Sequence, residues 1–127
     1  MIHKTMKEKF AFLIDTYDMK YNKLVFDTDE SGSFLGPMYA HCFYNENGVF
    51  VIYYAVQRNE WYFYKSDKYS TNQKDLLKED ISDKVYELIR STKSICFSEI
   101  SKLSSRLKKE LLKSPMLFGI LLKQRSL

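Results

Sequence analysis

The sequence is poor in the residues that build catalytic and metal sites. Its 127 residues include only four glycines, two prolines, two cysteines and two histidines. The glycines are too scattered to form a loop whose neighbouring backbone amides cradle a phosphate. Cys42 and Cys96 lack metal-ligand spacing, so we expect buried free thiols rather than a zinc site or a disulfide. HExxH, paired CxxC and GxSxG motifs are absent, and the sequence predicts no catalytic residue, no cofactor and no metal.

Few side chains in the sequence are suited to general acid–base catalysis. Only His3 and His41 carry an imidazole, the side chain that ordinarily titrates nearest neutral pH. His41 and Cys42 are neighbours in a predicted strand and therefore point to opposite faces, whereas a nucleophile and its base need hydrogen-bond contact. An enzyme that uses His41 is the weakest of the functional hypotheses, and a non-enzymatic protein is expected.

Long apolar runs are missing as well. The longest one near the C-terminus, residues 116–122, is far shorter than the roughly 20 residues that cross a bilayer. Residues 1–18 have acidic residues within their apolar run and no small-residue cleavage site, unlike a secretory signal. We therefore expect a cytoplasmic protein without membrane insertion. The length fits one domain, residues 1–127.

Aromatic and β-branched residues, by contrast, are concentrated in residues 38–65. Their alternation predicts three antiparallel strands with reversals at residues 45–48 and 58–60. Counting by two places Trp61 and Phe63 on one face, which we expect to lie under helices, and Tyr62 and Tyr64 on the other. A belt of tyrosines would then face water or a partner. The alternative is cross-strand packing that only stiffens the sheet.

Helical periodicity flanks this meander. Residues 5–18 are predicted to form a helix that starts with a capping box of Thr5 and Glu8. Apolar residues at helical spacing predict a second helix over residues 73–92 and a third over residues 98–112.

The remaining elements complete the expected fold class. Residues 23–26 form a short strand candidate, and Gly36 with Pro37 is expected to turn the chain into the meander. The sequence thus predicts an α+β domain with an N-terminal helix, an antiparallel meander of three to four strands, and C-terminal helices packed on one face of the sheet.

Two segments carry unbalanced charge. Asp27, Asp29 and Glu30 lie in a polar, glycine-containing loop that does not match a calcium loop, because the twelfth position is Met38 rather than a glutamate. This loop is either simply solvated or a recognition loop for a basic partner. From Lys93 onward there are eight basic residues and two acidic ones. That basic segment is either a solvated helix face or a contact for an acidic protein, nucleic acid or a membrane surface.

Three stretches together resemble a known protein class. They are FLGPMYAHCFYNENG at residues 34–48, VQRNEW at residues 56–61 and SDKYS at residues 66–70. The sequence over roughly residues 5–92 is similar to small bacterial immunity proteins of polymorphic toxin and contact-dependent growth inhibition systems. The segment from Lys93 onward lies outside this resemblance.

The resemblance implies a cytoplasmic, non-enzymatic antidote that binds the C-terminal domain of a cognate toxin, for example a nuclease, and occludes its active site or substrate surface. Candidate contacts are the acids Asp27, Asp29 and Glu30, which can mimic phosphates, and the tyrosines Tyr39, Tyr62 and Tyr64. The alternative is a non-catalytic accessory domain that binds nucleic acid or an anionic surface through its basic C-terminal segment. No small-molecule substrate is expected under either hypothesis.

Overall fold

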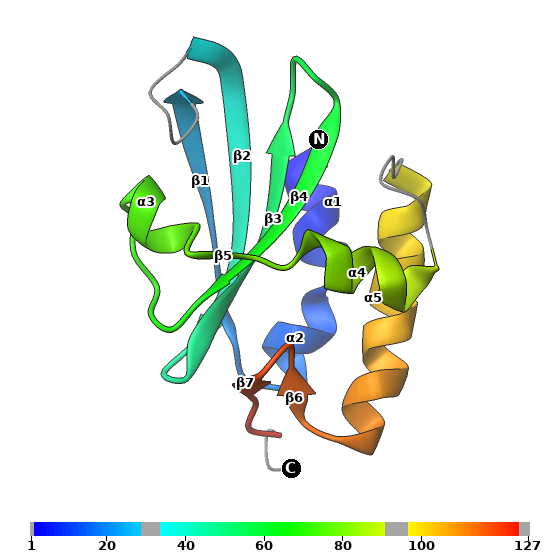
Figure 1. The fold of residues 1–127 in the computed structure, drawn as a ribbon. Coiled ribbons are helices and arrows are strands. Elements are labelled where there is room, and N and C mark those ends of the chain that lie inside the picture. The colour runs from blue at the N-terminus through cyan, green and yellow to red at the C-terminus, as the bar shows by residue number, and fades with distance from the viewer. Residues whose placement is uncertain (1, 29–33, 91–96, 125–127) are drawn as a thin grey trace.

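The structure is a computed structural model that describes residues 2–28, 34–90 and 97–124. Within these ranges it is a mixed α/β fold with a five-stranded antiparallel sheet, in the order β1-β2-β3-β4-β5, and a separate β6-β7 hairpin (Figure 1). The strands are β1 (Lys20–Thr28), β2 (Phe34–Asn45), β3 (Gly48–Ala55), β4 (Glu60–Ser66), β5 (Glu79–Asp80), β6 (Met116–Leu117) and β7 (Ile120–Leu121). The described helices are α1 (Ile2–Lys9), α2 (Ala11–Asp15), α3 (Gln73–Leu76), α4 (Ser82–Ile89) and α5 (Phe97–Lys113).

The predicted three-stranded meander is confirmed as β2, β3 and β4. Glu46 and Asn47 form the two-residue connection between β2 and β3, and the Asn47 amide donates to the Asn45 side chain at 2.7 Å. This local bond stabilises the reversal, as is usual for asparagine in turns. The third helix is also confirmed, since α5 spans the predicted range with one further residue at each end.

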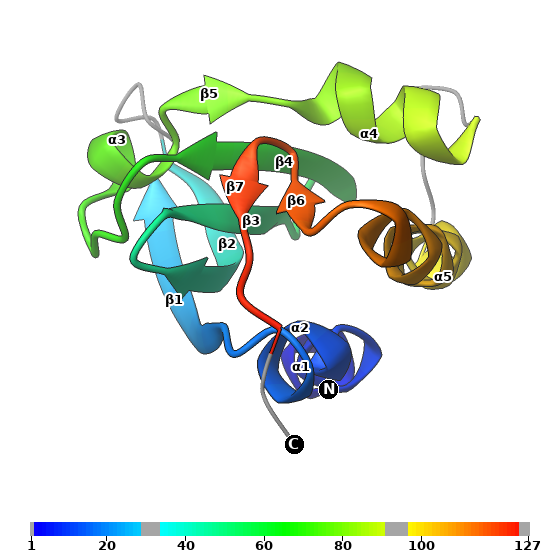
Figure 2. The ribbon, with the colours of Figure 1, turned by 90° about the horizontal axis from the view of Figure 1, so that it is seen from below.

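Alternation along the strands gives the sheet two apolar faces. Trp61 and Phe63 lie in the larger core, together with side chains of α1, α2, α4, α5 and the C-terminal hairpin. Tyr62 and Tyr64 belong to a second cluster on the opposite face, next to Leu76 of α3. Figure 2 shows α1, α2 and α5 on one side of the curved sheet and α3 on the other. Every residue of β3 is buried, because both faces of this central strand are covered.

The single helix predicted over residues 73–92 is wrong. The chain instead forms α3, the short edge strand β5 and α4, because it passes around the edge of β4. Leu77 packs in the second cluster whereas Ile81 packs in the larger core, so one straight helix cannot bury both side chains. Ser82 secures the crossing, since its hydroxyl accepts a hydrogen bond from the Phe63 amide at 2.9 Å.

The N-terminal helix is also interrupted. Phe10, which is fully buried against Phe43, has non-helical backbone angles and separates α1 from α2. Helix α1 already begins at Ile2, so Thr5 lies inside it and the predicted capping box is wrong. The helical segment ends before Asp18, which adopts a left-handed conformation with φ 57°. The Met19 amide then bonds back to the Leu13 carbonyl at 2.9 Å, which closes the helix end.

Gly36 and Pro37 do not make the predicted turn, because both lie inside β2. The pairing of β1 with β2 shifts register between Phe26 and Thr28, opposite this glycine and proline. Such a bulge suits a proline, which cannot donate to the ladder, and a glycine with φ +80°. The short strand predicted at residues 23–26 is correspondingly extended to the whole of β1.

The C-terminal hairpin closes one end of the larger core. Leu117 and Ile120 are almost completely buried there, and the ring of Phe118 stacks on Phe50 at 5.5 Å. The side chains of Asn45 and Asn47 both donate to the Leu121 carbonyl, at 3.1 and 3.0 Å. The segment beyond α5 is therefore an integral part of the packing.

Candidate partner-binding surface

The second face of the sheet combines small and aliphatic side chains with several tyrosines, one of them on the central strand β3. Strand register places Ala40 next to Tyr53 and Tyr53 next to Tyr62, so these three form one row across β2, β3 and β4. The Tyr53 hydroxyl is used internally, because it donates to the Met38 sulfur at 3.1 Å and accepts from Gln73 at 2.8 Å. Tyr62, at the side of the row, is only partly buried.

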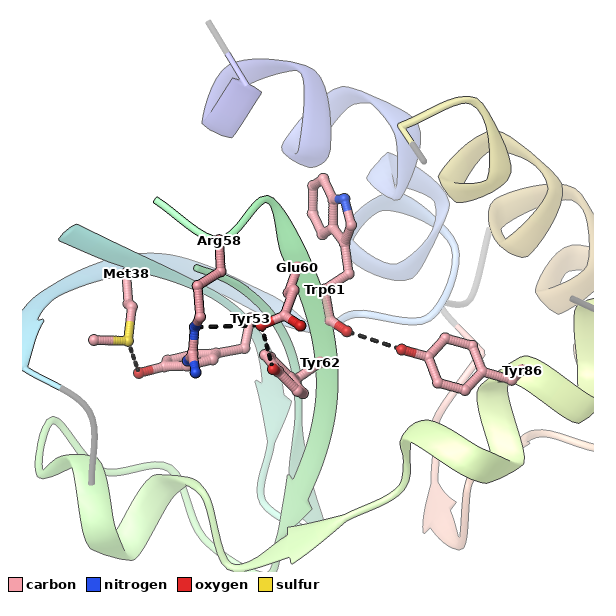
Figure 3. A network of polar contacts seen from close by, with 7 residues as sticks. All are labelled: Met38, Tyr53, Arg58, Glu60, Trp61, Tyr62 and Tyr86. Atoms are coloured by element: carbon pink, nitrogen blue, oxygen red, sulfur yellow. Dashed lines mark hydrogen bonds and ion pairs between the residues drawn. The ribbon is translucent and has the colours of Figure 1, made fainter. Parts of the chain in front are cut away.

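Tyr62 belongs to a polar cluster with Arg58 and Glu60, which we call the turn cluster (Figure 3). One carboxylate oxygen of Glu60 accepts from the Tyr62 hydroxyl at 2.7 Å and lies 3.2 Å from Nε of Arg58. The guanidinium of Arg58 also lies over the Tyr62 ring, 5.9 Å from its centre. Arg58 and Glu60 keep 43% and 49% of their side-chain surface exposed, so the cluster stays accessible although its members contact one another.

The backbone beneath the turn cluster is held from two sides. Asn59 has a left-handed conformation with φ 51°, and its side chain accepts from the Tyr54 hydroxyl at 2.7 Å. On the far side of β4, the Tyr86 hydroxyl donates to the Trp61 carbonyl at 3.0 Å (Figure 3). These contacts limit the movement of the turn, so a partner would meet a preformed arrangement.

Partial burial and the Glu60 carboxylate raise the pKa of Tyr62 to about 12. Burial is the larger cause, and the hydrogen bond to Glu60 adds to it because the phenol must stay protonated to donate. Tyr62 is therefore a neutral hydrogen-bond donor across the physiological pH range.

The structure separates the predicted contact residues. Asp27 is exposed at the end of β1, whereas Asp29 and Glu30 lie outside the described residues. Tyr39 is partly buried on the face of the larger core, where Lys23 lies 5.2 Å from its ring centre. Tyr64 is 9% exposed and packs edge-on against Tyr53 at 5.7 Å.

The predicted belt of tyrosines is therefore wrong as a single exposed surface. Tyr39 and Tyr62 lie on opposite faces of the sheet, and Tyr64 is buried by cross-strand packing. Tyr39 and Tyr62 each remain partly exposed, but because they lie on opposite faces they cannot belong to one contact surface. The face that carries Tyr62 and Tyr64 is not fully open to solvent, since Leu76 of α3 packs against it.

Sequence reasoning missed Arg58 and Glu60 as candidates, because both were assigned only to a chain reversal. The signal was present only in part. Glu60 and Tyr62 alternate by two within β4, which places their side chains on the same face of the strand. Arg58 lies in the turn before β4, where the strand period does not apply.

The opposite orientation of His41 and Cys42 is confirmed. His41 is fully buried on the side of the larger core, where its Nδ1 lies 3.0 Å from the Tyr21 hydroxyl. Cys42 is a buried free thiol in the second cluster, and burial raises its pKa to about 12. The thiolate is therefore not populated at neutral pH, and the two side chains cannot act as a nucleophile and its base. Cys96 lies outside the described residues.

Within residues 2–28, 34–90 and 97–124, no three His, Cys, Asp or Glu side chains are grouped so that they could hold a metal ion. The helices of the same ranges are all too short or too polar to cross a lipid bilayer. A comparison of the chain with protein families, with curated protein sequences and with solved structures finds no match.

Proposed function

We propose that this protein is a non-catalytic immunity protein that binds a cognate bacterial toxin domain in the cytoplasm and occludes its active site or substrate surface. The observation that carries the proposal is the turn cluster of Arg58, Glu60 and Tyr62. Arginine and tyrosine dominate the energetics of protein interfaces, and side chains that are already fixed lose little entropy on binding.

The state of the chemically reactive side chains supports binding rather than catalysis. His41 and Cys42 are both fully buried, on opposite faces of the sheet. Neither side chain can reach a substrate without opening the fold. The resemblance of residues 34–48, 56–61 and 66–70 to immunity proteins points to a toxin as the partner.

Electrostatics suggests how such a toxin would approach. The exposed Asp27 lies one residue before the end of β1, and this end of the strand is at the same end of the sheet as the β3–β4 turn (Figure 1). A carboxylate at the same end of the sheet as the turn cluster is complementary to the basic cleft of a nuclease, and such complementarity mainly accelerates association. The contribution of Asp29 and Glu30 stays a prediction from the sequence.

Co-expression tests the function directly. The toxin domain encoded next to this protein should stop growth when expressed alone, and growth should recover when both proteins are present. Calorimetry with the purified pair should show a complex of defined stoichiometry. If the protein neither rescues growth nor binds any toxin domain encoded beside it, the proposed function is wrong.

Substitution then tests the surface. Tyr62→Ala removes a side chain of the hot-spot type and should weaken binding by about tenfold or more, which corresponds to at least about 1.4 kcal/mol. Lys84→Ala is the control. It breaks an exposed ion pair, in which Nζ of Lys84 lies 3.6 Å from the Glu79 carboxylate, and this pair does not belong to the turn cluster. Equal affinity of the Tyr62 variant and the control would exclude the turn cluster as the contact.

A further inference from the structure

A groove of about 390 Å³ lies between α4 and α5, away from the turn cluster. Helix α4 and its C-cap contribute Leu88, Ile89 and Arg90 to its lining, and α5 contributes Ser101, Lys102, Ser105, Arg106 and Lys109. Leu88 and Ile89 are partly buried and pack against the larger core, so they form a firm apolar floor. The neighbouring position of the two helices is visible in Figure 2.

The rim of this groove is positively charged. Lys102, Arg106 and Lys109 follow one another at the spacing i, i+4 and i+7, which places them on one side of α5 over about 10 Å of helix. Arg106 lies 3.8 Å from the Glu110 carboxylate. In the part of the chain that the structure describes, the side chains of Arg90, Lys102 and Lys109 form no ion pair, and no acidic side chain lines the groove.

Arg90 adds a further cation on the α4 side of the groove. It is the C-cap of α4 and has the left-handed angles φ 54° and ψ 44°. Glycine is the usual residue in this conformation, because a side chain makes it strained. The chain nevertheless has an arginine here, and its side chain lines the groove opposite the basic stripe of α5.

We propose that the α4–α5 groove binds an acidic amphipathic helix of a protein partner. Carboxylates spaced by three or four residues on such a helix match the i, i+4, i+7 stripe of α5, and its apolar side chains would cover Leu88 and Ile89. The guanidinium groups of Arg90 and Arg106 can each bind a carboxylate through two parallel hydrogen bonds. Nucleic acid fits less well, because the groove lining contains no aromatic ring for base stacking and its apolar floor offers nothing to a phosphate.

This inference does not rest on the proposed function. Tyr62 and the groove lie on different sides of the sheet, since α4 and α5 pack in the larger core and Tyr62 packs in the second cluster. A protein that binds no toxin could still bind an acidic helix here, and an immunity protein could lack this second contact.

Selection of peptides tests the groove with the full chain as bait. The probe is a display library of helical 16-residue peptides with randomised surface positions. We expect enrichment of peptides with Asp or Glu at three- and four-residue spacing beside a stripe of Leu, Ile or Phe. The double variant Lys102→Glu/Lys109→Glu should weaken the binding of these peptides by at least about tenfold. The control variant Lys20→Glu/Lys74→Glu changes the net charge equally at exposed positions outside the groove and should bind as the original protein does.

Arg90→Gly provides a readout that a purely structural role would not give. It relieves the left-handed strain and should raise the Tm, while it removes one cation from the groove and should lower the affinity for the enriched peptides. The proposal is overturned if no acidic amphipathic peptide is enriched, or if the groove variant and the control bind such peptides equally. It is also overturned if a labelled 20-nucleotide RNA binds with a steep salt dependence that requires Lys102 and Lys109 while the peptides do not bind.

Discussion

Replacement of Ile120 by alanine should destabilise the whole protein, although this residue lies near the C-terminus in a two-residue strand. Its side chain is 3% exposed within the larger core. It also covers Gly48, because a Cβ atom built there would lie 3.0 Å from Cγ1 of Ile120. Removal of three carbons from such a site loses their transfer free energy and leaves a cavity, at a cost of about 2–5 kcal/mol.

The hairpin is fixed in place, so the cavity should not close easily. Asn45 and Asn47 hold the Leu121 carbonyl, and Lys65 donates to the Phe118 carbonyl at 2.7 Å. The assay is urea unfolding followed by circular dichroism and tryptophan fluorescence, from which the free energy of unfolding is extrapolated. Because domains of this size are stable by only about 5–15 kcal/mol, Ile120→Val should be measured as well, with an expected cost of about 0.5–1.5 kcal/mol.

Leu121 gives the matched control on the same hairpin. Its side chain is 50% exposed, so Leu121→Ala should change the free energy of unfolding by no more than about 0.5 kcal/mol. If the Ile120 and Leu121 variants are equally stable, the hairpin does not close the core, and the segment beyond α5 is an appendage rather than part of the fold.

Three further predictions follow from the interior of the sheet. Burial raises the pKa of Cys42 from 9.0 to about 12, so between these pH values the unfolded chain loses the thiol proton while the folded chain keeps it. The free energy of unfolding should therefore fall as the pH rises above 9, by up to about 1.4 kcal/mol per pH unit. Cys42→Ala should reduce this slope. Parallel pH profiles of the original protein and the variant would show that Cys42 is not the group responsible. Ser82→Ala removes the hydroxyl that accepts from the buried Phe63 amide at 2.9 Å and should lower the free energy of unfolding in urea by about 1–3 kcal/mol. Ser105 is exposed, so Ser105→Ala should change this free energy little. Gly36→Ala should lower the free energy of unfolding by about 1–2 kcal/mol, because Gly36 has a φ of +80°. The added Cβ atom would also lie 2.7 Å from the Gln57 side chain, and Gln57→Ala should remove only this overlap. If the double variant is as stable as the original protein, backbone strain is not the cause.

The two faces of the meander could be predicted because the period of a strand is fixed. Trp61 and Phe63 must point away from Tyr62 and Tyr64 whatever the rest of the chain does, and the structure shows this arrangement. Alternation does not reveal how deeply a face is covered, however. The burial of Tyr64 and the accessibility of Tyr62 depend on α3 and on neighbouring strands, which lie elsewhere in the sequence.

The turn cluster shows the same division. The alternation of Glu60 and Tyr62 could be predicted from the sequence, but the 2.7 and 3.2 Å contacts that join Tyr62 and Arg58 to Glu60 depend on the conformation of the β3–β4 turn. The division of residues 73–92 into α3, β5 and α4 could not be predicted, because local periodicity favours one helix there. Helical periodicity counts spacing along the chain and contains no information about the edge of a sheet.

The sequence by itself determined the three strands of the meander, their alternation and the long helix α5, since each depends on side chains a few residues apart. Only the tertiary structure decided that the chain crosses from one sheet face to the other through β5, and that Arg90 stands opposite the basic stripe of α5. The physical reason is that both features depend on burying apolar surface between segments distant in the chain, and no local pattern records that requirement.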